Sequence, residues 1–320
     1  MEIYKRNKEI NGLFNDFPLK GNKEKLDEKS LKLGNPFLYY SHPNGKIFIG
    51  DSIKWLRSLE TESVDLVFAD PPYNIKKAEW DTFDSQEQYV EWSLQWIKEA
   101  SRVLKQNGTL YVCGFSEILA DIKLPALRFF KGCKWLVWHY KNKANLGKDW
   151  GRSHESILHF RKDKNFTFNL DNIRIPYGEH TLKYPEHPQA ETSQYGNGKK
   201  KYSAWKPNEK GAKPKDVLEI PTTCNGMHEK TNHPTQKPEE LLRKIILASS
   251  NENDLVIDPF LGSGTTAVVA EQLGRKWNGC DISSEYCDWA IKRIELVENW
   301  SIDKWIEYDF NNEQRRKSIR

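Results

Sequence analysis

Residues 254–266 read DLVIDPFLGSGTT, and this stretch decides the fold. Its apolar part predicts a buried strand at 254–258, and the segment that begins at Thr265 predicts a helix. Gly262 and Gly264 stand in the turn between them, where glycine lets a ligand approach the backbone and the free N–H groups of the helix. A tight strand-to-helix turn without any ligand is the alternative interpretation.

An acid after the following strand indicates what such a ligand contains. Asp281 stands 23 residues after Asp258, and in nucleotide sites an acid at about this distance accepts hydrogen bonds from ribose hydroxyls. The turn lacks a full GxGxxG and a GxxxxGK[ST] motif, which counts against a dinucleotide or a triphosphate. The pattern therefore favours a nucleoside that needs no phosphate cradle.

Strands and helices alternate on both sides of this turn. Such alternation predicts an α/β fold with a mostly parallel, doubly wound sheet. The length of 320 residues fits one large domain or a domain with an insertion. The predicted strands are 46–50, 65–70, 108–114, 134–140, 156–160, 254–258 and 277–282, and the predicted helices are 86–104, 239–249, 265–273 and 284–297.

The composition excludes several classes of protein. Aromatic residues make up 12% of the chain, which is enough for a core and excludes overall disorder. Five cysteines without a CxxC pair exclude a disulfide framework, and scattered histidines predict no metal site. No apolar run approaches the roughly 18 residues of a membrane span, and the charged start of the chain lacks a secretory pattern. We therefore expect a cytoplasmic protein.

The positive charge is concentrated in one segment. Residues 141–215 contain 16 Lys and Arg against 8 Asp and Glu, an excess of +8, whereas the whole chain carries only +4. A local excess of this kind predicts a surface that binds a polyanion. A solvated insertion without a partner is the alternative.

A second motif, Asp70-Pro71-Pro72-Tyr73, stands at the end of the strand predicted at 65–70. The prolines stiffen the turn and remove two N–H donors, which leaves a carboxylate, backbone carbonyls and an aromatic face. This acceptor-rich set suits an exocyclic amino group on a flat ring that stacks on Tyr73. A proline turn with a buried tyrosine is the alternative, although α/β proteins place their sites at such strand ends.

Together the two motifs resemble those of the amino-group DNA methyltransferases, which transfer a methyl group from S-adenosylmethionine to adenine N6 or cytosine N4. The catalytic motif precedes the cofactor motif and a basic insertion separates them, which is similar to the circularly permuted beta group. The residues 50–52 (GDS) and 233–238 (HPTQKP) agree with this order. The resemblance covers about residues 45–295 and implies a Rossmann-like methyltransferase sheet.

The resemblance implies a role for each motif residue. Asp70, Pro71, Pro72 and Tyr73 would be catalytic: Asp70 and the Pro71 carbonyl hold the target amino group, and Tyr73 stacks on the flipped base. S-adenosylmethionine is the implied cofactor, and positioning of the two substrates is the main catalytic contribution. The residues implied to bind the cofactor are Asp51 near the adenine, Asp281 at the ribose, Asp258, Phe260, Gly262, Gly264, Thr265 and Thr266 at the methionine end, and Asp70 beside them.

The basic segment then becomes the predicted contact with double-stranded DNA, since Lys and Arg neutralise phosphates. A companion restriction endonuclease that acts on the same site and a second copy of the chain are also compatible with the resemblance. The predicted DNA contacts are Lys141, Lys143, Lys148, Arg152, Lys199, Lys200 and Lys201. The predicted parts are a polar arm at 1–35, a catalytic half at 36–140, a target-recognition insertion at 141–225, a cofactor half at 226–297 and a tail at 298–320 that frays at its basic end, 315–320.

The target retains alternatives. Asp rather than Ser at position 70 is typical of the adenine enzymes of this family, and the broad surface of Tyr73, Asn74 and Ile75 suits a purine, so adenine N6 is favoured over cytosine N4. The NPPY enzymes, which modify RNA or protein, form a second class that Asp70 and the permuted order oppose. A non-catalytic DNA-binding protein on a decayed enzyme fold is a third class, which the intact Asp70 and glycines oppose.

Overall fold

The computed structural model of the chain describes residues 19–25, 35–75, 81–141, 148–185, 206–298 and 300–318. The chain divides into two compact units, Met1–Phe168 with Asp216–Trp300, and Asn169–Lys215 with Ser301–Arg320. All predicted site residues that the structure describes belong to the first unit. No helix among the described residues is long and apolar enough to cross a membrane.

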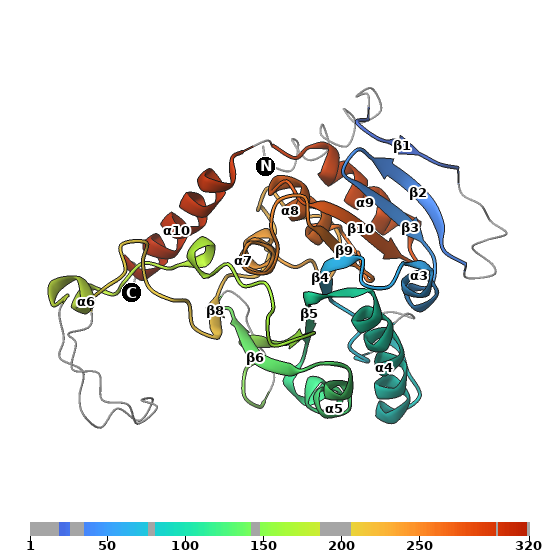
Figure 1. The fold of residues 1–320 in the computed structure, drawn as a ribbon, viewed down its shortest axis with the longest axis horizontal. Helices are drawn as coiled ribbons and strands as arrows, with labels where there is room; N and C mark the ends of the chain where they lie inside the picture. Colours follow the sequence, from blue (N-terminus) through green and yellow to red (C-terminus); the bar gives the residue numbers. More distant parts are fainter. Residues whose placement is uncertain are drawn as a thin grey trace. The chain divides into compact units, whose positions relative to one another are not determined.

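One sheet of ten strands runs through the described part of the first unit, in the order β1-β2-β3-β10-β9-β4-β5-β7-β6-β8 (Figure 1). Its centre, β3-β10-β9-β4-β5, is parallel throughout, and antiparallel pairs occur only towards the two edges. This confirms the predicted mostly parallel sheet. The strands are β1 Asn22–Lys23, β2 Phe37–His42, β3 Gly45–Ile49, β4 Val64–Ala69, β5 Leu104–Gly114, β6 Gly132–His139, β7 His154–Arg161, β8 Val217–Glu219, β9 Leu255–Asp258 and β10 Lys276–Asp281.

The helices of this unit form two groups, one on each side of the sheet (Figure 1). On one side α4 packs between α3 and α5, and on the other α8 packs between α7 and α9. The doubly wound architecture is therefore confirmed. The bounds are α3 Ser52–Ser58, α4 Gln86–Val103, α5 Ser116–Ala126, α7 Glu239–Ser249, α8 Thr265–Gln272 and α9 Ser284–Glu295, and the second unit contains α6 Glu179–Lys183 and α10 Ile302–Ser318.

Local sequence explains where these helices begin and what they bury. The side chains of Asp51, Ser85 and Ser283 accept a backbone N–H in the first turn of α3, α4 and α9, which satisfies one of the free donors at each helix start. In α4 the buried residues Trp96 and Ala100 are four positions apart, so they share the face that packs on the sheet.

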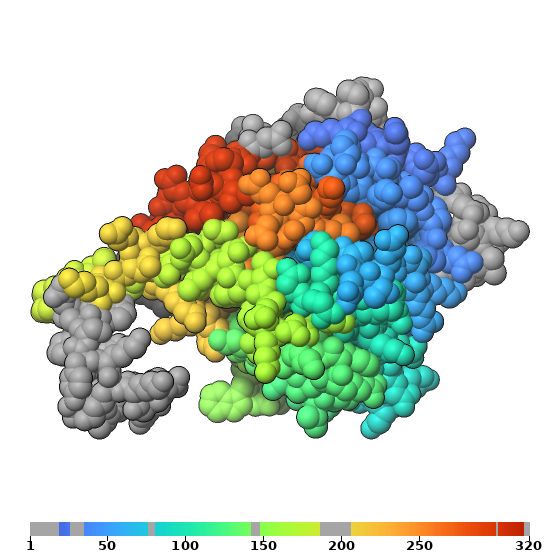
Figure 2. Space-filling model, in the orientation of Figure 1, coloured from blue at the N-terminus to red at the C-terminus, as the bar shows by residue number. Residues whose placement is uncertain are grey.

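The strand order brings the two motifs together. β9 and β10 lie between β3 and β4, and β4 pairs directly with β9, Val67 opposite Ile257. Asp70 and Asp258 therefore meet at the same edge of the sheet, although 188 positions separate them in sequence. On the face drawn in Figure 2, the first strands (blue) border the region of α8 (orange), where Asn44 donates to Glu271 over 2.9 Å.

Three segments differ from simple expectations drawn from the sequence. β7 lies within the range predicted as an insertion, yet it pairs with β5 and β6 in the main sheet. β1 lies within the predicted polar arm and pairs with β2. α10 extends to Ser318, so residues 315–318 of the predicted tail are helical, and fraying of this end stays a prediction. Trp305 and Asp309, four positions apart, are both buried, so one face of this helix is anchored.

Candidate active site

A pocket of about 280 Å³ opens at the carboxyl edge of β3, β10, β9 and β4. Every residue predicted to bind the cofactor or the target amino group lines this pocket except Gly264, which is the N-cap residue of α8. The predicted residues that line the pocket are Asp51, Asp70, Pro71, Pro72, Tyr73, Asp258, Phe260, Gly262, Thr265, Thr266 and Asp281. The structure thus gathers both motifs around one cavity.

The turn between β9 and α8 needs its glycines. Gly262 and Gly264 have φ values of 50° and 78°, in the left-handed region that side chains disfavour. A Cβ at Gly264 would lie 2.4 Å from the Cβ of Ala290 on α9, and a Cβ at Gly262 would lie 3.0 Å from Nε2 of His233. Glycine therefore lets α8 start directly beneath the pocket.

Two buried acids hold this turn in shape. Asp258 accepts hydrogen bonds from the N–H of Phe260 over 2.9 Å and from the hydroxyl of Thr266 over 2.6 Å. Asp281 accepts from the N–H of Gly262 over 2.8 Å and from that of Ser283 over 2.9 Å. Burial raises the pKa of Asp258 to about 7 and that of Asp281 to about 6, and these hydrogen bonds act in the opposite direction.

Aromatic rings form much of the rest of the pocket wall. Trp92 on α4 lies 5.7 Å from Phe260 between ring centroids, and Phe83 lies 5.1 Å from Trp92. His233 lies 4.5 Å from Tyr286 in an edge-on contact, and burial lowers its pKa to about 4. The sequence predicted only Phe260 among these five. Trp92 lies on a helix, where an apolar residue gives no sign that it faces a cavity rather than the core, and His233 belongs to the 233–238 segment, to which no role was assigned.

The Asp70-Pro71-Pro72-Tyr73 segment is held from outside the motif. Asp81 accepts the backbone N–H of Tyr73 over 2.6 Å, and its other oxygen accepts that of Ile75 over 3.2 Å. The hydroxyl of Tyr89 on α4 donates to the carbonyl of Pro72 over 2.6 Å. These contacts keep the backbone of the motif rigid at the pocket edge, which fixes the position of the loop that carries Asp70.

The carboxylate of Asp70 already has two strong donors. The Tyr73 hydroxyl lies 2.6 Å from Oδ1, and Nζ of Lys237 lies 2.6 Å from Oδ2. Glu155 on β7 completes the group, with Oε2 3.2 Å from the Tyr73 hydroxyl and 3.5 Å from Nζ of Lys237. Burial alone would lower the pKa of Lys237, but the charges of Asp70 and Glu155 outweigh it and hold this pKa above its usual range.

Lys237 and Glu155 were not predicted as site residues. Lys237 is part of the HPTQKP segment, and Glu155 is a charged residue in a strand whose other residues are mostly buried. A charge inside a buried strand was the available signal. Tyr73 is only 8% exposed, with the Phe115 ring 5.0 Å away, and its predicted stacking on a base stays a prediction.

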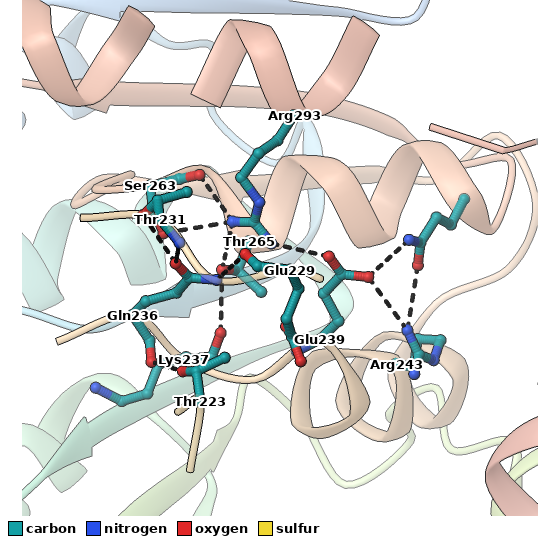
Figure 3. Close-up of polar contacts among 11 residues, drawn as sticks. Thr223, Glu229, Thr231, Gln236, Lys237, Glu239, Arg243, Ser263, Thr265 and Arg293 are labelled. Atoms are coloured by element: carbon teal, nitrogen blue, oxygen red, sulfur yellow. Dashed lines mark hydrogen bonds and ion pairs between the residues drawn. The ribbon is translucent and has the colours of Figure 1, made fainter. Parts of the chain in front are cut away.

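A second polar network ties the glycine turn to the segment that carries Lys237 (Figure 3). Arg293 on α9 donates to the carbonyl of Ser263 over 2.8 Å, to the hydroxyl of Thr265 over 2.9 Å and to Glu239 over 2.9 Å. The Thr265 hydroxyl donates in turn to the carbonyl of Lys237 over 3.1 Å. The backbone of Lys237 is thus fixed to the cofactor turn.

The predicted DNA contacts are only partly described. Lys141 and Lys148 are exposed, whereas Arg152 forms an ion pair with Glu117 at 2.6 Å and its guanidinium lies 3.8 Å above the ring of Phe115. Trp150, two positions before Arg152, is 95% exposed. Lys143, Lys199, Lys200 and Lys201 lie outside the described residues.

Fold and site together define a class of protein. A parallel α/β sheet carries, at one edge, a glycine turn with an acid after the next strand and a rigid, acceptor-rich loop beside it. This arrangement is that of a transferase that brings a nucleoside cofactor to an amino group. Within the described residues, no group of three or more His, Cys, Asp or Glu is placed to hold a metal ion.

Comparisons with known proteins support the assignment to a class of methyl-transferring enzymes. The N6_N4_Mtase family model, described as DNA methylase, matches residues 64–293. The DNA adenine methyltransferase YhdJ of Escherichia coli K12 is 37% identical over 270 residues, 81% of this chain and 85% of that one. The type II methyltransferase M1.MboII of Moraxella bovis is 36% identical over 265 residues, 79% of this chain and 97% of that one. The chain belongs to the N6/N4 DNA methylase family.

A solved structure shows the same fold. The PvuII DNA methyltransferase, which is cytosine-N4-specific, matches with a TM-score of 0.58 and covers 85% of this chain and 93% of that one. The two sequences are 21% identical, so this likeness concerns the fold. The family uses S-adenosylmethionine, and the protein is a methyltransferase that depends on this cofactor.

Proposed function

We propose that the protein transfers a methyl group from S-adenosylmethionine to N6 of adenine in double-stranded DNA. The observation that carries the proposal is the carboxylate of Asp70 at the pocket edge, one strand away from the glycine turn after β9. A carboxylate accepts hydrogen bonds and donates none, which suits an exocyclic amino group. The relative from Escherichia coli is named a DNA adenine methyltransferase.

The residues of the pocket fit this cofactor. Gly262 has a φ of 50° and a Cβ there would press on His233, so the turn that lines the pocket needs glycine at this position. The methionine end would lie along this turn, beside Phe260, Thr265 and Thr266. Asp281 would accept from the ribose hydroxyls, and Asp51 would lie near the adenine. When bound, S-adenosylmethionine supplies an electrophilic methyl group on a sulfonium.

Asp70 prepares the target amino group. Its carboxylate and the carbonyl of Pro71 would accept the two N–H groups, which draws the nitrogen lone pair out of conjugation with the ring and aims it at the methyl group. The negative charge then stabilises the positive charge that develops on the nitrogen. A methylated amino cation is acidic, so a proton leaves after transfer and no strong base is required.

The base reaches the pocket by flipping out of the duplex. We place the DNA along the loop of Lys148, Trp150 and Arg152, because Arg152 is joined to the pocket through Phe115 and Tyr73. Lys148 would neutralise a phosphate, and the exposed indole of Trp150 would stack on the bases that the flipped nucleotide leaves. Lys141, which is exposed, would bind a further phosphate.

Cytosine N4 remains the second candidate target, because it presents the same kind of amino group to the same acceptors. A methyltransferase relative is named as type II, and we propose that this chain also belongs to a restriction–modification system with a companion endonuclease of the same site.

Nucleoside mass spectrometry of treated plasmid DNA tests the target. Radiolabel from S-adenosylmethionine is offered in parallel to duplex DNA, RNA and protein. We expect label in duplex DNA only, and N6-methyladenine in its digest. Detection of N4-methylcytosine without N6-methyladenine would make cytosine N4, not adenine N6, the target of the enzyme. Label confined to RNA or protein would overturn the DNA assignment, and absence of cofactor binding in calorimetry would indicate a decayed enzyme.

A further inference from the structure

A cation occupies the position in which Asp70 would hold its substrate. Nζ of Lys237 lies 2.6 Å from Oδ2 of Asp70, and only 6% of the lysine side chain is exposed. Its ammonium is an N–H donor, like the amino group of a base. The Tyr73 hydroxyl holds the other oxygen of Asp70. A target amino group that takes the acceptor site on Oδ2 now used by Lys237 therefore has to displace this ammonium.

Lys237 in this place would also oppose the reaction. Methyl transfer moves positive charge onto the amino nitrogen, and an ammonium bound to the same carboxylate repels that charge. Removing Lys237 from the pocket is costly, because a buried ammonium needs an opposite charge nearby. The lysine thus needs a second acceptor within the site.

Glu155 is placed to be that acceptor. Its Oε2 is 3.5 Å from Nζ of Lys237, so a shift of about 0.7 Å brings the two atoms to the usual 2.7–2.9 Å of a charge-assisted hydrogen bond. The lysine backbone is held by Thr265, and its flexible four-carbon side chain can make the shift alone. Two carboxylates and one ammonium also leave the group with a net charge of −1, which favours the cationic transition state.

We propose that Lys237 occupies the place of the target amino group in the free enzyme and passes from Asp70 to Glu155 when the base enters. Lys237 and Glu155 are then positioning residues for Asp70. The inference rests on the proposed transfer to a DNA amino group, because only a donor that competes for Asp70 drives the exchange.

A double-mutant cycle tests this exchange. In Glu155→Gln the lysine stays on Asp70 and the net charge of the group becomes zero. In Lys237→Met two carboxylates face each other without a cation and share a proton. The double variant frees Asp70 and restores the net charge of −1. We expect each single variant to lower the single-turnover rate about tenfold or more, and the double variant to return within about threefold of the wild type.

Lys105→Met is the matched control. Lys105 pairs with Asp65 at 2.8 Å near the start of β4, the strand whose other end carries Asp70. This variant loses a lysine–aspartate pair remote from the pocket, and its single-turnover rate should match the wild type. Calorimetry with S-adenosylmethionine should show unchanged cofactor affinity for every variant, which confirms that the pocket is folded.

The outcomes separate the two proposals. A double variant as slow as the product of the two single effects would overturn the exchange while methyl transfer by the wild type stands. A wild type that transfers no methyl group to DNA would overturn the proposed function and the exchange with it. If Glu155→Gln does not fold, Glu155→Leu replaces it in the cycle: it also removes the second acceptor and the charge, so it should slow transfer, and the loss should again disappear when Lys237→Met is added.

Discussion

Replacing Gly264 by alanine should damage the protein through one contact that the structure defines. The residue has a φ of 78°, and the new Cβ would lie 2.4 Å from the Cβ and 2.8 Å from the Cα of Ala290. Left-handed backbone costs a side chain about 1–2 kcal/mol, and overpacking of a close contact adds about 1–3 kcal/mol. We expect the free energy of unfolding to fall by about 2–5 kcal/mol in Gly264→Ala.

Gly274 provides a matched control. Its φ is 69°, close to that of Gly264, but a Cβ there would meet nothing within 4 Å. Gly274→Ala should therefore lose only the conformational part, about 1–2 kcal/mol. The difference between the two variants measures the contact with Ala290. Ala290→Gly removes the nearer of the two clashing atoms, so it should recover part of the loss in the double variant Gly264→Ala/Ala290→Gly.

Urea unfolding and calorimetry with S-adenosylmethionine measure both consequences. A displaced α9 also moves the turn that precedes α8, so cofactor affinity should fall in Gly264→Ala and stay unchanged in Gly274→Ala. Equal unfolding free energies for the two alanine variants would refute the reasoning, because the close approach of α8 and α9 would then carry no cost. Absence of recovery in the double variant would show that the strain lies elsewhere.

Three further predictions concern the pocket and its surroundings. Asp70→Asn should reduce methyl transfer about 100-fold or more with cofactor affinity in calorimetry nearly unchanged, and a matching loss of affinity would assign Asp70 to the cofactor. Trp150→Ala should lower kcat/KM on a matched duplex about tenfold. A mismatch at the target base should restore the rate of this variant, because a mismatched base flips out of the duplex at lower cost. Equal losses of kcat/KM on both duplexes would contradict stacking by Trp150. Burial raises the pKa of Asp258 to about 7. Between about pH 4 and 7 the folded wild type therefore retains a proton on Asp258 that the unfolded chain releases. The stability of the wild type falls as the pH rises through that range. Asp258→Asn removes this dependence, so its stability relative to the wild type should rise between urea titrations at pH 5 and pH 8, by at most about 3 kcal/mol. Parallel curves would contradict the raised pKa.

The fold class and the two motifs could be predicted from the sequence, because both depend on the pattern of neighbouring residues. Buried strands are short apolar runs, and the strand that ends at Asp258 and the helix that starts at Thr265 were readable within a residue. The prediction that Asp70 and Asp258 meet came from the resemblance to the family, which implies that both motifs serve one site. Periodicity alone does not tell which strands are neighbours.

The contacts between distant side chains could not be read in this way. Lys237 and Asp70 are 167 positions apart, and no local rule pairs one lysine among many with one aspartate. Trp92 lies within the helix predicted at 86–104, yet nothing in the helical spacing distinguishes a residue that faces a cavity from one that faces the core. Helix α5 was not predicted, because it contains Pro125 in its last turn, which normally indicates a helix end.

The placement of β9 between β4 and β10 has a consequence for how the chain is made. Leu66 on β4 pairs with Val256 on β9, which is synthesised much later in the chain. At about 5–20 residues per second, the ribosome adds Val256 roughly 10–40 seconds after Leu66. During that time the edges of β3 and β4 that will later face β10 and β9 have no partner strand. Unpaired strand edges attract other strands. The middle of the sheet forms last, so a nascent chain that stops short of β9 should be captured by chaperones, whereas one released after β10 should not.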